Sequence, residues 1–243
     1  MLIVNADDLG RSAAETDAVL SFYNEGRITS ASAMVFMKDS ERAAELARDS
    51  GLDVGLHLNL SECFTGNGYS SRIQARHNRI ISFLRHDKYS HLLYNPFLRR
   101  SISEVYQAQI DEFRRLYRKQ PSHVDGHHHM HLCANVIIGK LIPPGVKLRR
   151  HFSFWPGEKG LLNRTYRRLV DRWLARQHRM PDYFFCLLQC IQQGKWNRVE
   201  ALARSSTVEL MTHPIVAAEA EYLKGGEFHA LLQRVQSGTY ASL

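Results

Sequence analysis

The chain contains 243 residues, of which 44% are hydrophobic and 23% are charged, a composition typical of globular proteins. Its formal net charge is +8, but the basic residues are dispersed and form no lysine- or arginine-rich block, so no nucleic-acid partner is expected. No apolar stretch is long enough to span a bilayer and the N-terminus lacks a basic signal-peptide region, so we expect a cytoplasmic protein without a membrane partner. The four cysteines show no paired metal-ligand spacing and are expected to be reduced thiols.

Strands and helices alternate through the first sixty residues. A short apolar run opens the chain, and Ser12 followed by Glu15 forms a capping box that begins an amphipathic helix ending at Gly26. The other expected elements are strands at 2–4, 31–36 and 53–58 and a helix at 39–50. This alternation predicts an α/β fold in which βαβ units build a parallel sheet or barrel.

The rest of the chain is less regular. Residues 61–100 contain many polar groups and no sustained period, which predicts a loop-rich insertion or a long active-site loop. Beyond it we expect helices at 103–118 and 163–177, strands near 146–148 and 207–211, and an aromatic loop at 151–160. No internal repeat or linker is present, so residues 1–243 are expected to form a single domain.

Five histidines lie within the nine residues 123–131. A protein core cannot bury five imidazoles without giving each a hydrogen-bond partner, and neutral imidazole is the commonest metal ligand. The alternative is an exposed polar turn or a tag-like run, but this run lies in the middle of the chain between apolar segments. The cluster therefore predicts a metal site.

Polar clusters follow four of the predicted strands, at the end where each strand finishes. They are Asn5-Asp7-Asp8, His57-Asn59, the segment from Asp125 to His131, and the segment from Glu209 to His213. The C-terminal edge of parallel strands is where the active sites of α/β proteins assemble. The coincidence predicts that the four clusters converge on one site.

The alternation of residues in two strands supports this convergence. In the strand at 53–58 the apolar residues occupy alternate positions, so His57 and Asn59 point away from the helix-packed face. In the last strand Glu209 and His213 also share one face. For His57 alone the alternative is a hydrogen-bonded core histidine, and for Glu209 we favour a structural carboxylate over direct catalysis.

These positions indicate which residues would bind the metal. Asp7 and Asp8 are adjacent, so only a turn at the strand end can bring both to the site. A carboxylate with two imidazoles is a common set for a catalytic divalent metal. Within the histidine cluster His127 is the expected ligand and His129 the second choice, since even-offset residues share a face if the strand persists. Two imidazoles favour zinc, whereas the carboxylate also permits magnesium.

Four motifs stand out in the chain: Asn-Ala-Asp-Asp-Leu-Gly at 5–10, Gly-Leu-His-Leu-Asn-Leu at 55–60, His-Val-Asp-Gly-His-His-His-Met-His at 123–131 and Met-Thr-His-Pro at 211–214. Together they resemble the YdjC-like carbohydrate deacetylases, a family related to polysaccharide deacetylases that includes ChbG-type chitooligosaccharide deacetylases and HpnK-type proteins. The motifs occur in family order and cover most of the chain. The segment 61–100 matches no motif and leaves substrate choice open.

The resemblance implies a distorted TIM-like (β/α) barrel of about seven parallel strands. It also implies metal-dependent hydrolysis of the acetamide of an N-acetylated sugar or oligosaccharide, with a small carbohydrate as partner. By motif, Asp8, His57 and His127 would bind one divalent ion, zinc or magnesium.

The resemblance also assigns the proton-transfer roles. Asp7 would be the general base and His213 the general acid, and either Arg149 or Arg150 would orient the base.

Two other functions fit the same residues. One is metal-dependent hydrolysis of another bond, such as a phosphoester, although no phosphate-binding glycine loop is present. The other is non-catalytic binding of a sugar or metal, which has no need of a general base. A homodimer is compatible with the sequence.

Overall fold

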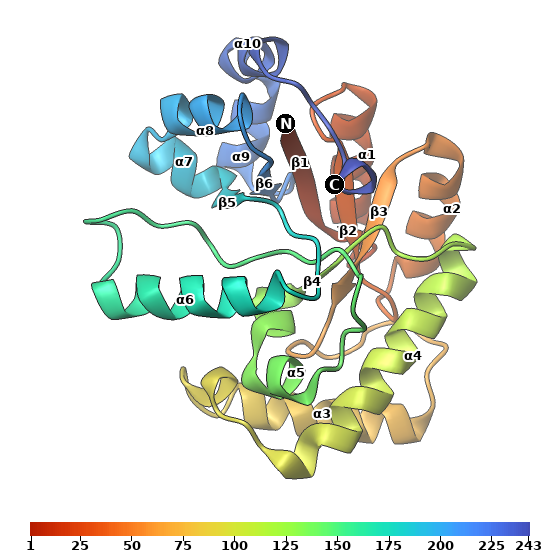
Figure 1. Cartoon of the computed structure of the whole chain (residues 1–243). Coiled ribbons are helices and arrows are strands. Elements are labelled where there is room, and N and C mark those ends of the chain that lie inside the picture. Colours follow the sequence, from red (N-terminus) through yellow and green to blue (C-terminus); the bar gives the residue numbers. More distant parts are fainter.

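The computed structural model describes residues 1–243 and contains six parallel strands and ten α-helices (Figure 1). The strands are β1 Leu2–Leu9, β2 Ser30–Ala33, β3 Asp53–Leu58, β4 Val124–Gly126, β5 Tyr183–Cys186 and β6 Val208–Thr212. The helices are α1 Ala13–Asn24, α2 Ser40–Ser50, α3 Ser71–Leu84, α4 Arg99–Tyr117, α5 Ala134–Gly139, α6 Leu161–Leu174, α7 Leu187–Gln193, α8 Trp196–Ala203, α9 Ala217–Lys224 and α10 Gly226–Arg234. Short 3-10 turns are η1 Ser90–Leu92, η2 Pro96–Leu98, η3 His127–Leu132 and η4 Tyr240–Ser242. None of the helices combines the length and apolarity that a membrane crossing requires.

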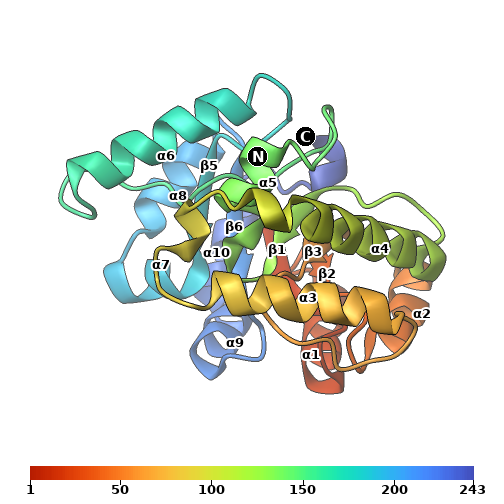
Figure 2. The same cartoon turned by 90° about the horizontal axis from the view of Figure 1, so that it is seen from below.

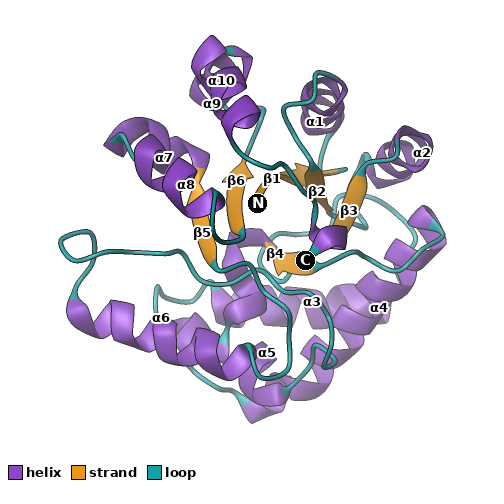
Figure 3. Cartoon of the chain, turned by 45° about the horizontal axis from the view of Figure 1, so that its top comes forward, coloured by secondary structure: helices purple, strands orange, loops and turns teal.

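The strands form one curled sheet in the order β4-β3-β2-β1-β6-β5, with the helices outside it (Figure 3). The sheet has six strands rather than about seven, because the strand expected near 146–148 forms only isolated bridges. These bridges join Leu148 to Val124 of β4 and Lys147 to Arg179, in the gap between β4 and β5. The expected barrel is therefore a curled half-barrel whose edge strands are linked by one extended segment.

Local signals in the first half of the chain are confirmed. The side chain of Ser12 accepts a hydrogen bond from the backbone N–H of Glu15 and caps α1. Helix α2 ends at Gly51, which adopts the left-handed conformation that glycine tolerates best. All eight residues of β1 are buried, because this strand is central in the sheet and is covered on both faces.

The segment 61–100 is not simply a loop. It contains α3, which begins at the cap residue Ser70 and lies side by side with α4 below the sheet (Figure 2). The helix buries Ile80, Leu84 and His77. Polar residues between these positions lie on the exposed face of α3, so the apolar periodicity of the helix is weak in the sequence.

Gly55 allows β3 to pass directly beneath the ring of His123. A Cβ atom at Gly55 would lie 2.3 Å from Cε1 of His123. The ring cannot move away freely, because it stacks on Tyr240 with 3.7 Å between ring centroids and its Nε2 lies 3.0 Å from Ser32 Oγ. The pairing of β3 with β4, which carries the histidine cluster to the sheet edge, therefore requires glycine at this position.

We predict that Gly55→Ala lowers the free energy of unfolding by about 1–3 kcal/mol, the usual cost of overpacking a core. Urea unfolding followed by circular dichroism measures the effect. Gly226→Ala is the matched control, since a Cβ atom there meets nothing within 4 Å. Equal stability of the two variants would show that the β3–β4 contact tolerates a methyl group.

His77 anchors α3 to the end of β3 as a neutral imidazole. Its Nε2 lies 3.0 Å from the carbonyl oxygen of Asn59, and its ring stacks on Phe64. Burial lowers the pKa of His77 to about 4, against the opposing effect of the hydrogen bond to Asn59. In the unfolded chain the same group titrates near its ordinary value of 6.5. Below pH 6.5 the unfolded state therefore binds more protons than the folded state, and the free energy of unfolding decreases as the pH is lowered.

We predict that His77→Gln removes part of this pH dependence. Between pH 7.5 and pH 5 the parent should lose about 2 kcal/mol of unfolding free energy through this group, and the variant should not. Urea denaturation at the two pH values measures both slopes. His86→Gln serves as control, because His86 is highly exposed. An equal loss of unfolding free energy between pH 7.5 and pH 5 in the parent and the His77 variant would contradict the lowered pKa of His77.

Candidate active site

A bulge at the end of β1 brings two adjacent carboxylates to the same place. The register of β1 against β2 shifts between Ala6 and Leu9, and Asp8 adopts a φ of 67°, unusual for a residue other than glycine. Regular extended backbone would send Asp7 and Asp8 to opposite faces. In the structure both are buried, and both lie around one narrow crevice together with His213.

Asp8, His57 and His127 form a group whose ligand atoms all lie within 4.8 Å of one another. The Oδ1 atom of Asp8 lies 3.3 Å from Nε2 of His57 and 3.1 Å from Nδ1 of His127. This oxygen is buried and makes no hydrogen bond of good geometry. Ligand atoms around a divalent cation at about 2.1 Å lie roughly 3 Å apart, so the arrangement fits such an ion.

The second nitrogen of each of these imidazoles meets a carboxylate. Nδ1 of His57 lies 2.9 Å from Oδ1 of Asp125, and Nε2 of His127 lies 2.8 Å from Oε2 of Glu62. Metal-binding histidines commonly have such an outer carboxylate, which fixes the tautomer and the ring orientation. For His57 the contact is a hydrogen bond that orients the ring, whereas Nε2 of His127 and Glu62 lie at ion-pair distance without hydrogen-bond geometry; in both residues the other ring nitrogen lies towards Asp8.

Sequence analysis did not identify Glu62. The residue follows β3 in the segment that matched no motif, and a turn holds it in place: Asn59 Oδ1 accepts from the backbone N–H of Glu62, and Asn59 Nδ2 donates to the Glu62 carbonyl. Arg11 binds the Glu62 carboxylate, with Nη2 3.0 Å from Oε1. A carboxylate three residues after the polar end of a strand was the only signal available.

A single buried guanidinium neutralises the carboxylates beneath this group. Arg149 is fully buried, and its Nη atoms lie 2.7 Å from both oxygens of Asp7, 2.7 Å from Asp125 and 2.7 Å from Glu209. The structural role preferred for Glu209 agrees with this contact. The paired geometry fixes the orientation of the Asp7 carboxylate at the crevice.

Arg150, the alternative partner of Asp7 in the sequence, points elsewhere. Its guanidinium binds Asp171 of α6, with Nη2 3.1 Å from Oδ2. Consecutive residues of an extended segment face opposite sides, so only one of the two arginines can enter the site. The structure brings Arg149, not Arg150, to Asp7.

Charge within the cluster shifts the pKa of its members. Burial opposes ionisation of Asp125, but Arg149 and His57 outweigh it and hold the pKa of this carboxyl well below its usual range. Burial likewise opposes protonation of His57, yet Asp125 and Asp7 raise its pKa to about 10. For Glu209 burial prevails over Arg149 and raises the pKa to about 7. The centre therefore stabilises positive charge at His57, the position where a cation would be bound.

His129 does not join the ligand group. Strand β4 ends at Gly126, and His128 and His129 in the following turn η3 have φ values of 52° and 58°. The condition on which His129 was the second choice, a strand that persists beyond His127, is therefore not met. His129 instead packs edge-on against Phe152 and Phe184.

His213 follows β6 and is partly exposed at the mouth of the crevice. Its backbone N–H donates to Oε2 of Glu219, which also accepts from the hydroxyl of Thr212. Burial raises the pKa of Glu219. This contact holds the His213 backbone, while the imidazole remains 31% exposed and can reach a bound molecule.

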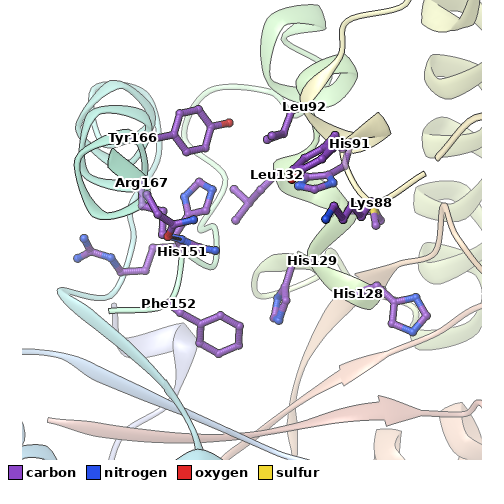
Figure 4. Close-up of a pocket in the computed structure, with 14 residues that line it drawn as sticks. Lys88, His91, Leu92, His128, His129, Leu132, His151, Phe152, Tyr166 and Arg167 are labelled. Carbon is purple, nitrogen blue, oxygen red and sulfur yellow. Dashed lines mark hydrogen bonds between the residues drawn. The ribbon is translucent and has the colours of Figure 1, made fainter. Parts of the chain in front are cut away.

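A larger cavity of about 420 Å³ lies next to the turn η3 that follows His127 (Figure 4). His128, His129 and Phe152 line it on one side, and residues of η1 and α6 close the other. Its cationic side chains include Lys88, Arg150 and Arg167. A polar ligand of moderate size fits this space.

The chain is similar in sequence to several proteins named carbohydrate deacetylase or chitooligosaccharide deacetylase. A carbohydrate deacetylase of Clostridium beijerinckii is 31% identical over 88% of this chain and 80% of that protein, and one of Mus musculus is 29% identical over 88% and 77%. A chitooligosaccharide deacetylase of Serratia marcescens is 33% identical over 54% of this chain and 51% of that protein.

Solved structures share the fold. An Enterococcus faecalis protein named for cellobiose-phosphate cleavage superposes with a TM-score of 0.70 at 18% identity, covering 99% of this chain and 97% of that one. A mutant CE4 family pseudoenzyme with restored activity superposes with a TM-score of 0.50 at 11% identity, over 100% of this chain and 66% of that one. The model of the family described as "YdjC-like protein" matches residues 1–236, and the chain belongs to that family.

Proposed function

We propose that this protein is a metal-dependent carbohydrate deacetylase that hydrolyses the acetamide of an N-acetylated sugar to acetate and an amino sugar. The observation that carries the proposal is the convergence of Asp8, His57 and His127 beside an Asp7 carboxylate held by Arg149. The names of the relatives support an acetylated carbohydrate, and that of the Serratia protein supports a chitooligosaccharide-type substrate.

Asp8, His57 and His127 are the residues that would hold the metal, through one oxygen and two nitrogens. Such a donor set favours zinc or another transition metal and also permits magnesium. A divalent cation bound there supplies Lewis-acid activation of the acetamide carbonyl and of water.

The proton transfers fall to Asp7 and His213, which lie around the same crevice. The Asp7 carboxylate accepts the proton of the attacking water, and the paired hydrogen bonds from Arg149 hold that carboxylate in its orientation. Water oxygen bonds to the carbonyl carbon, and the carbon–nitrogen bond then breaks. The imidazolium of His213 donates its proton to the departing nitrogen, because an unprotonated amine is a poor leaving group.

We predict that Asp7→Asn slows acetate release from N,N′-diacetylchitobiose by about 100-fold or more, since positioned proton transfer contributes about 10²–10⁴ to the rate. Metal content, measured by mass spectrometry on the same sample, should be retained. Asp17→Asn, an exposed carboxylate of α1, is the matched control. Parent-level turnover in Asp7→Asn would rule out the base role.

The same preparation tests the deacetylase proposal itself. Assays for acetate and phosphate release run in parallel on acetylated sugars and on phosphoesters. Phosphate release without acetate release would favour the phosphoester alternative. Metal binding with no turnover on any acetylated sugar would favour a binding protein.

We predict that Glu62→Gln weakens metal binding about 10- to 100-fold, the usual effect of losing an outer partner of a ligating histidine. Isothermal titration of the chelator-treated protein with Zn²⁺ measures the affinity directly and does not depend on turnover. Glu45→Gln, on the exposed face of α2, controls for the loss of one negative charge. Unchanged affinity in Glu62→Gln would remove Glu62 from the metal centre.

A further inference from the structure

Helix α6 carries an exposed apolar stripe beside an exposed cationic row. Leu162, Tyr166 and Leu169 recur at intervals of four and three residues and therefore share one side of the helix. Leu162 is 87% exposed and Leu169 is 59% exposed. The rest of the protein leaves Leu162 and Leu169 uncovered, whereas Tyr166 also lines the large cavity, and an exposed apolar surface of this kind marks an interaction site.

The cationic row is not neutralised by the protein. Arg168 and Arg172 of α6, and Arg176 in the turn after it, are spaced by four residues, are exposed, and form no ion pair. In α4, by contrast, Arg114 pairs with Asp111. The one acidic residue of α6 is buried and pairs with Arg150 and His151 on the inner side of the helix. The outer surface of α6 therefore presents leucines and uncompensated positive charge together.

A second apolar segment lies across the large cavity from α6. It runs from Lys88 to Phe97 through η1 and η2, and Phe97 is 82% exposed. Leu92 from this segment and Tyr166 from α6 point towards one another at the cavity (Figure 4). The two segments thus border the same opening.

We infer that this face, formed by the outer side of α6 and by residues 88–97, docks on the surface of an anionic lipid bilayer. Leucine and aromatic side chains enter the boundary between headgroups and acyl chains, while arginines bind lipid phosphates, as in amphipathic helices that lie on membranes. Docking places the cavity beside His128 and His129 against the headgroups. This differs from the sequence-based expectation of no membrane partner, which considered only spanning segments.

Charge argues against a second copy of this chain as the occupant. In a two-fold symmetric dimer the same patch meets itself, so the arginine rows of two α6 helices would face each other. Facing like charges are unfavourable, whereas anionic lipid supplies the complementary charge. Sedimentation equilibrium of the parent protein is therefore part of the test.

The experiment measures binding of the full chain to vesicles of phosphatidylcholine with and without phosphatidylglycerol, by co-sedimentation. We expect binding only to the vesicles that contain phosphatidylglycerol, and weaker binding at high salt. Arg168→Gln with Arg172→Gln should lower the partition coefficient about tenfold or more. Leu162→Ser with Leu169→Ser should lower it to a similar degree.

Leu46→Ser with Arg114→Gln is the matched control, because both residues are exposed on α2 and α4, on the opposite side of the molecule from α6 (Figure 3). This variant should bind vesicles like the parent. Circular dichroism and thermal unfolding confirm that each variant is folded.

Three results would overturn the inference. They are no binding of the parent to either vesicle, equal binding to both, or a parent dimer that the leucine variant dissociates. The last result would identify the α6 face as an interface between copies. Vesicle binding requires no turnover, so its failure leaves the proposed deacetylase activity standing.

Discussion

The guanidinium of Arg149 is the interaction on which the site depends. It is fully buried among three carboxylates that come from three different strands: Asp7 on β1, Asp125 on β4 and Glu209 on β6. Burying these carboxylates without a cation would be strongly unfavourable, since leaving one buried charge unpaired costs about 3–5 kcal/mol. The arginine therefore ties the centre of the sheet to its β4 edge and fixes the orientation of the Asp7 carboxylate.

The position of Arg149 also explains how the open side of the sheet is organised. Arg149 follows the extended segment that bridges β4 and the chain near Arg179, and its backbone N–H donates to the carbonyl of Val124. Tyr240, close to the C-terminus, reaches Oε2 of Glu209 from the other side with a 2.5 Å hydrogen bond. Segments distant in the sequence are thus held by one network of charges and hydrogen bonds, and the half-barrel needs no seventh strand to fix its site.

Charge is distributed differently at the centre and on the outer surface. At the centre, carboxylates surround Arg149 and the imidazoles, so positive charge is stabilised and a cation fits. On the outer side of α6 the arginines lack partners and leucines lie beside them. The large cavity borders α6, and its lining includes His128 and His129, which follow the candidate ligand His127 in the chain, together with the cationic side chains of Lys88, Arg150 and Arg167.

The sequence by itself determined the elements whose signals are local. Neighbouring residues determine the cap at Ser12, the end of α2 at Gly51 and the alternation that turns His57 inward. The family motifs pointed to Asp8, His57 and His127 as candidate metal ligands, and the structure brings these three together. Short-range backbone preferences and side-chain periodicity are enough to encode such features.

Only the tertiary structure decided which side chains meet. It showed the bulge that places Asp8 beside Asp7, selected Arg149 over Arg150, excluded His129 and brought Glu62 to His127. It also replaced the expected barrel of about seven strands with a curled sheet of six. These outcomes depend on strand register and on the pairing of buried charges between segments far apart in the chain, and no window of sequence contains both partners.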